Sequence, residues 1–296
     1  MEQVYPERSA PELTTVERRR WVFRHPAMIR VTHWLNAIIL AGLLMSGLQI
    51  FNAHPALYWG KVSTFERPLV SMQATEDDPP QGVTTILGHR FNSTGVLGLS
   101  TSAAGEASER AFPDWITLPA DQDLATGRRW HWIFAWLLVI NGALYLAYGI
   151  ASGQFWHRLI PGRDQMRDIG GAVREHVTFR FAEGDEAKRY NVIQKLTYLV
   201  VVAILLPVQV LAGLTMSPGV NSFAPFLLDL FGGRQSARTV HFVVANLLVL
   251  FVIVHVFEVI VSGLWNNMRA MTTGWFVIER RRRPSRHAGS KESAKR

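Results

Sequence analysis

Four long apolar stretches constrain the fold more than any other feature of the sequence. They cover residues 31–51, 130–150, 196–216 and 240–264, so each holds between 21 and 25 residues. About 20 residues of α-helix span the roughly 30 Å of hydrocarbon in a bilayer, and a helix satisfies its own backbone hydrogen bonds there. We therefore predict an all-α membrane protein, a bundle of four transmembrane helices with a long external connection between the first two.

The segments around these stretches divide the chain into a basic arm, the bundle and a basic tail, at residues 1–30, 31–264 and 265–296. The connection 52–129 is too long for a plain link, because long loops without structure of their own are uncommon unless they are functional. We expect an external cap with short helices, one of them near residues 114–118; a floppy insertion is the alternative. In the connection 151–195 we expect a short amphipathic helix on the membrane surface.

The distribution of basic residues predicts the orientation. Lys and Arg number 6, 8 and 9 in the arm, the connection 151–195 and the tail, but 6 in residues 52–129 and 2 between the last two apolar stretches. By the positive-inside rule, we expect both termini to lie in the cytoplasm and residues 52–129 to lie on the outer side of the membrane. We expect the first span to stay as an inner-membrane anchor, the end of the tail to be disordered against lipid headgroups, and no nucleic acid to bind.

Histidine is the residue type that recurs in the apolar stretches and can bind a metal. The chain has ten histidines and no cysteine, which excludes thiolate-held iron–sulfur clusters, covalently attached c-type haem and disulfides. Six histidines, among them His25 and His54, lie outside the stretches, and we expect them to be solvated or interfacial. The other four are His33, His131, His241 and His255.

The spacing of the last two histidines points to two centres. His241 and His255 are fourteen residues apart, which is a rise of about 21 Å along a helix with both side chains within about 40° of one face. They cannot share one metal ion, but they can serve two centres stacked across the membrane. The predicted helix directions put His131 at the outer level of His241, and His33 at the inner level of His255. Two pairs follow, each with imidazoles from two helices, as in cofactor sites of helix bundles.

Haem suits such pairs better than zinc does. Structural zinc takes four protein ligands, whereas a haem iron takes two axial ligands and its macrocycle fills apolar space. We therefore predict two b-type haems, the outer held by His131 and His241 and the inner by His33 and His255. A histidine in a membrane helix can also be a hydrogen-bonded core residue, so a haem-free proton-coupled transporter is one alternative.

Three segments resemble the bacterial cytochrome b561 and nickel-hydrogenase b-type cytochrome superfamily, which includes formate dehydrogenase gamma subunits. They are RHPAMIRVTHWLNA, GRRWHWIFAWLLVINGALYL and RTVHFVVANLLVLFVIVHVFE, and the thiosulfate-reductase-type cytochrome b subunits are the members most like them. The resemblance implies a di-haem subunit of an oxidoreductase complex that passes electrons between membrane quinone and a periplasmic redox partner, such as a molybdopterin oxidoreductase. It implies that the same four histidines are ligands, and that quinone binds near His255 and His33. Residues 52–129 are longer than in the hydrogenase or formate dehydrogenase members, which leaves the partner open.

Charged residues flank the histidines. Arg128 and Arg129 precede His131, and Arg238 precedes His241 by three residues. These arginines are candidates to bind haem propionates, although snorkelling to the membrane surface explains them equally well. Glu258, one helical turn past His255, is a candidate proton carrier for quinone, with a plain salt bridge as the alternative.

A free-standing superoxide:quinone oxidoreductase is the alternative function for a haem protein, since the outer arginines would attract an anion. Whether the chain is itself an enzyme stays open. Pro207 predicts a kink in the third span. Four amides in the spans predict interhelical hydrogen bonds: Asn36, Asn141, Gln209 and Asn246.

Overall fold

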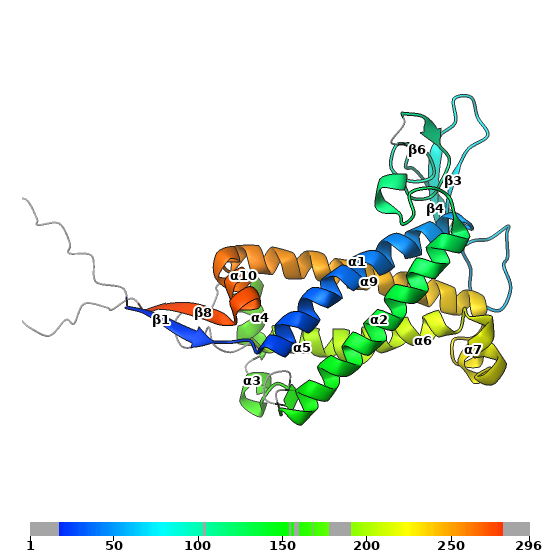
Figure 1. Cartoon of the computed structure of the whole chain (residues 1–296). Coiled ribbons are helices and arrows are strands. Elements are labelled where there is room, and N and C mark those ends of the chain that lie inside the picture. The colour runs from blue at the N-terminus through cyan, green and yellow to red at the C-terminus, as the bar shows by residue number, and fades with distance from the viewer. Residues whose placement is uncertain are drawn as a thin grey trace, which may run out of the picture.

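The computed structural model describes residues 18–102, 105–153, 155–156, 160–167, 169–177 and 191–280. Within them, four helices are long and apolar enough to cross a membrane, and they run along one another in Figure 1: α1 Ala27–Asn52, α2 Leu124–Ala151, the third span Val192–Leu214 and α9 Arg234–Val261. This confirms the predicted four-helix membrane bundle.

Helices α1 and α2 pack closely against each other. Gly42 allows the approach, because a Cβ atom there would lie 2.4 Å from the ring of Phe134. The amide of Asn141 donates to the Thr32 carbonyl at 2.9 Å and to Asn36 Oδ1 at 2.6 Å. These are the interhelical hydrogen bonds expected of Asn36 and Asn141, and they fix α2 to α1 near the His33 level.

The third span changes helix type part-way along. It consists of α5 Val192–Val200, a π-helical turn η4 Val201–Leu205, and α6 Leu206–Leu214. Pro207 lies two residues past the end of the π turn, and proline cannot supply the backbone N–H that a regular α-helix needs. Where the sequence predicted a kink at Pro207, the structure has a π-helical turn just before it. A cluster around Val201, Val244 and Leu248 packs this span against α9.

The connection between α1 and α2 is mainly β-structure. The cap, residues 53–123, contains a four-stranded antiparallel sheet in the order β2-β3-β4-β5: Ala56–Leu57, Val70–Ala74, Gly82–Ile86 and His89–Asn92. A second sheet pairs β6 Ser100–Thr101 with β7 Ala107–Ser108, and a short 3₁₀ helix, η1, covers Asp114–Ile116. The expectation of short helices is right for η1 and wrong for the rest of the cap.

The backbone conformation of two residues explains the turn between β4 and β5. Leu87 and Gly88 both have positive φ, at 49° and 85°, as a two-residue hairpin turn between twisted strands requires. Positive φ is easy for glycine but unusual for leucine. The sequence "LG" is therefore a weak hairpin signal.

The opposite end of the bundle carries the two ends of the described chain. Strand β1, Arg18–Phe23, pairs antiparallel with β8, Trp275–Arg280, and α10 Leu264–Thr273 joins β8 to α9. We call this two-stranded sheet the ribbon; Figure 1 shows it projecting from the end opposite the cap. His25, expected to be solvated or interfacial, is only 6% exposed, at the turn where the Gly274 carbonyl accepts from the His25 and Arg24 amides.

The remaining connections lie at one or the other end of the bundle. The one short amphipathic helix expected in residues 151–195 is found as two: α3 Arg163–Arg167 and α4 Ile169–Val177, near the ribbon end. Helices α7 Pro218–Phe223 and α8 Phe226–Leu230 lie at the cap end. Residues 1–17 and 281–296, which hold much of the predicted arm and tail, lie outside the described residues.

Candidate functional site

The four histidines of the membrane helices meet as two pairs. The ring centroids of His131 and His241 lie 6.1 Å apart, and those of His33 and His255 lie 6.2 Å apart. Helix α9 contributes one ring to each pair, while α2 and α1 supply the partners. These are the combinations that the helix directions predicted, the first toward the cap end and the second toward the ribbon end.

Each pair bridges two halves of the bundle. Helix α1 packs on α2, and α9 packs on the third span, but the two halves make few close backbone contacts with each other. The imidazoles reach across from one half to the other. At each of the two levels, side-chain rings therefore make the contact between the halves.

Hydrogen bonds determine the tautomer of His131. Its Nδ1 lies 3.1 Å from Ser46 Oγ, and the Ser46 hydroxyl donates to the Gly42 carbonyl at 2.6 Å. A carbonyl can only accept, so the serine oxygen accepts from the ring and Nδ1 carries the proton. Nε2 of His131 therefore keeps its lone pair.

His241 is held in the same tautomer by a different helix. Its Nδ1 lies 2.9 Å from the Gln209 carbonyl, which can only accept. Its Nε2 then has the lone pair, and the side-chain amide of Gln209 donates to it at 3.1 Å. This is the interhelical bond expected of Gln209. Because the amide uses the lone pair that a metal would take, it must turn aside when a metal binds.

Glycines on neighbouring helices make room for both cap-end rings. A Cβ atom at Gly213 would lie 3.1 Å from Cε1 of His241, and one at Gly47 would lie 3.4 Å from Cε1 of His131. Each ring is thus bounded by a glycine and by a hydrogen-bond acceptor from the same neighbouring helix. The cap-end pair is the more closely defined of the two.

Aromatic side chains surround the ribbon-end pair. The ring of His255 stacks on Phe251 with centroids 5.8 Å apart, and Tyr198 meets it edge-on at 6.3 Å. Trp34 meets His33 edge-on at 5.3 Å. Nδ1 of His33 is buried and has no hydrogen-bond partner among the described residues, an arrangement that usually signals a missing ligand or strain.

The predicted charged residues differ in their exposure and in the groups that they contact. Arg128 and Arg129 are exposed on the first turns of α2. Arg238 donates to the His54 carbonyl, and its guanidinium lies 5.6 Å from the centroid of Phe51, so it ties α9 to the cap. Glu258 is half-buried and lies three residues past His255 on α9.

One expectation for the polar residues of the spans is wrong. Asn246 donates to the Phe242 carbonyl within α9 at 2.8 Å instead of bonding to another helix. His54, expected to be solvated or interfacial, is half-buried: its Nε2 is covered and has no partner among the described residues, and its ring packs on Tyr58 and Phe65 with centroids 5.7 and 5.9 Å away. Burial, and to a lesser extent the charge of Arg238, lowers the pKa of His54 below its ordinary value. No spacing in the sequence marks His54 as buried.

Fold and site together define a multi-pass membrane protein whose four membrane histidines come in facing pairs. A family model described as prokaryotic cytochrome b561 matches residues 24–274, and the chain belongs to that family. A similar relative is the "Putative protein-methionine-sulfoxide reductase subunit YedZ1" of Azospira oryzae, 28% identical over 232 residues that cover 78% of this chain and 87% of the relative. No solved structure matches the chain. Membership implies haem b and electron transfer in the membrane.

The paired rings fit a haem iron. With metal–nitrogen bonds of about 2 Å, two imidazoles on opposite sides of one ion have centroids about 6 Å apart, close to both observed separations. Among the described residues no group of three or more His, Asp or Glu could hold a metal ion, whereas a haem iron requires only two protein ligands. At the cap end both Nε2 atoms have a lone pair for the iron.

Proposed function

We propose that this protein holds two b haems and carries electrons between membrane quinone and an external redox protein. The observation that supports this most strongly is the presence of two facing imidazole pairs, at 6.1 and 6.2 Å, on one helix. Fourteen residues along α9 separate the levels by about 21 Å. Two centres at that separation reach from one membrane face toward the other.

The proposed ligands are His131 and His241 at the cap end, and His33 and His255 at the ribbon end. When bound, a b haem supplies a one-electron couple whose potential depends on its ligands and their hydrogen bonds. The protein's part is to keep the imidazoles neutral, to fix their tautomers and to exclude water. Arg238 and the exposed Arg128 and Arg129 are the proposed partners of the propionates at the cap end.

Orientation and the quinone site belong to the same proposal. The described parts of the three basic segments lie at the ribbon end, which we assign to the cytoplasmic side of a bacterial inner membrane by the positive-inside rule. Quinone would then exchange electrons near His255 and His33. Glu258 would move the accompanying proton, because acids inside membrane helices commonly mark proton routes.

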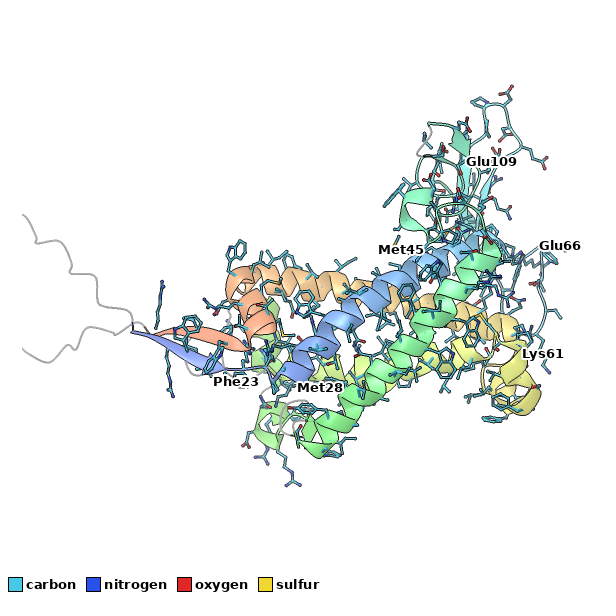
Figure 2. The ribbon with its side chains drawn as sticks, in the orientation of Figure 1. Phe23, Met28, Met45, Lys61, Glu66 and Glu109 are labelled. Atoms are coloured by element: carbon cyan, nitrogen blue, oxygen red, sulfur yellow. The ribbon has the colours of Figure 1, made fainter. Side chains whose placement is uncertain are left out.

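The firm attachment of the cap to the bundle favours an external protein as the redox partner. It is held to the bundle by buried polar contacts: Asn52 exchanges two hydrogen bonds with the Phe112 backbone, and the Gly60 carbonyl accepts from the amides of Gln235 and Ser236 at the start of α9. In Figure 2 the labelled Met45 lies where α1 meets the cap, and its carbonyl accepts from the Leu118 amide at 3.1 Å. A cap fixed in this way gives a soluble protein a firm surface. The relative's printed name as a reductase subunit supports a soluble redox partner.

The proposal is tested by reducing the purified protein in liposomes with a quinol. Wild type should show two b haems and reduction of both. His255→Ala should lose the ribbon-end haem and quinol-driven reduction of the haem that remains. His241→Ala should lose the cap-end haem but keep quinol-driven reduction. Full haem content in both variants would contradict the assigned ligands.

The superoxide alternative predicts a different result in the same preparation. Superoxide would reduce the cap-end haem rapidly, and the double substitution Arg128→Glu and Arg129→Glu would slow that reduction several-fold, because it removes the steering charge. Under our proposal these substitutions leave quinol-driven reduction of the ribbon-end haem unchanged, because both arginines lie at the cap end of α2.

A further inference from the structure

We infer that Ser46 is a positioning residue for the cap-end haem: its hydroxyl oxygen fixes the ring of His131 and lowers the reduction potential of the iron which that ring binds. This inference rests on the proposed function and deepens it. It concerns a residue that no sequence motif marks, on a helix that supplies a ligand to the other haem.

The geometry leaves the serine one role toward the ring. Ser46 is fully buried on α1. Its proton is used along its own helix, on the Gly42 carbonyl at 2.6 Å and near the Leu43 carbonyl at 3.3 Å. Such back-bonding is usual for serine within a helix. Here the oxygen has a second partner, because Nδ1 of His131 from α2 lies 3.1 Å away.

An accepted hydrogen bond changes the donor strength of the opposite nitrogen. When Nδ1–H donates to an acceptor, the imidazole becomes more basic and its orientation is fixed. A more basic axial ligand stabilises the oxidised iron more than the reduced iron, so the reduction potential falls. The bond from His131 to Ser46 should therefore hold the cap-end potential down.

The other rings provide a contrast. His241 donates to a main-chain acceptor, the Gln209 carbonyl, which no side-chain substitution removes. Nδ1 of His33 is buried without a partner among the described residues. The neighbouring Thr32 uses its hydroxyl on the Met28 carbonyl at 2.9 Å. Ser46 is thus a side-chain acceptor that can be deleted on its own.

The experiment is a redox titration of the full-length haem protein, followed by optical and low-temperature EPR spectra. In Ser46→Ala both haems should be retained, because the substitution removes one hydroxyl and leaves both proposed ligands, His131 and His241, in place. The cap-end haem, identified as the one missing from His241→Ala, should show a higher midpoint potential and an altered ferric EPR signal. The ribbon-end haem should titrate as in wild type.

Two matched variants separate the hydroxyl from packing. Ser46→Thr keeps the acceptor and should restore a potential close to wild type. Thr32→Val removes a buried hydroxyl that bonds along the same helix in the same way, and should leave the cap-end potential unchanged. An unmoved potential in Ser46→Ala, or equal shifts in Ser46→Ala and Ser46→Thr, would overturn the inference. Absence of haem from the wild type would instead overturn the proposed function.

Discussion

Among single residues, the glycines beside the cap-end rings give the sharpest expectation. A methyl group at Gly213 would lie 3.1 Å from Cε1 and 3.4 Å from Nδ1 of His241, which is closer than ordinary contact, whereas at Gly47 the corresponding distances to His131 are 3.4 and 3.7 Å. Gly213→Ala should therefore displace its ring and weaken retention of the cap-end haem by roughly 10-fold, as disturbed ligand support typically does.

The measurement is haem retained per protein during dilution or competition with apomyoglobin. Gly47→Ala should behave nearly as wild type. Gly142→Ala is the matched control on α2, since a Cβ atom there would have no neighbour within 4 Å. Equal haem loss in Gly47→Ala and Gly213→Ala would show that the close contact with His241 does not cause the loss of haem.

His54 makes the stability of the cap depend on pH. Its pKa is lowered in the folded protein from 6.5, mainly by burial, so the folded state binds a proton less readily than the unfolded state. Its contribution to stability is present above about pH 6.5 and is lost as the pH falls below that value. The thermal midpoint of the wild type should drop between pH 7 and pH 5 by more than that of His54→Gln. Parallel pH profiles of the two proteins would contradict the claim that His54 makes the stability depend on pH.

Among helices and strands, a buried guanidinium is one of the groups that hold the cap to α1. Arg110 donates to Gln49 Oε1 at 2.7 Å, to Thr117 Oγ1 at 2.9 Å and to the Ala120 carbonyl at 2.7 Å. Arg110→Met leaves these buried acceptors unsatisfied and should cost about 3 kcal/mol. Protease cleavage within residues 53–123 should become faster, and thermal unfolding should begin earlier. The exposed Arg90 of β5 provides the control, since Arg90→Met should change neither.

The helices and strands also show which parts of the fold the sequence predicts and which parts it does not. The apolar runs located all four spans, because hydrophobicity over about 20 residues is a local signal. The apolar runs did not locate the helix ends. The second run begins at residue 130, but α2 begins at Leu124, because Asp123 caps the helix by accepting from the Thr126 amide. The pairing of β1 with β8 joins segments about 250 residues apart, and no local pattern specifies such a contact. Of the site, helix direction and spacing predicted which rings meet, but not the part played by Ser46.

For the molecule as a whole, the absence of native cysteine makes orientation directly measurable. Single cysteines can be placed at two exposed positions, Glu76 in the cap and Arg20 in the ribbon. In intact bacterial cells with a permeable outer membrane, an impermeant maleimide should label Glu76→Cys. Arg20→Cys should react only after the inner membrane is opened. The reverse pattern would place the cap in the cytoplasm.

The pairing of four imidazoles as two haem sites is tested most directly by counting haem in double variants. Wild type should bind two b haems per chain, and His131→Ala and His241→Ala should each bind one. The double variant His131→Ala with His241→Ala should still bind one, because both residues serve the same iron, whereas His131→Ala with His33→Ala should bind none. One haem retained by the second double variant, or none by the first, would contradict the account.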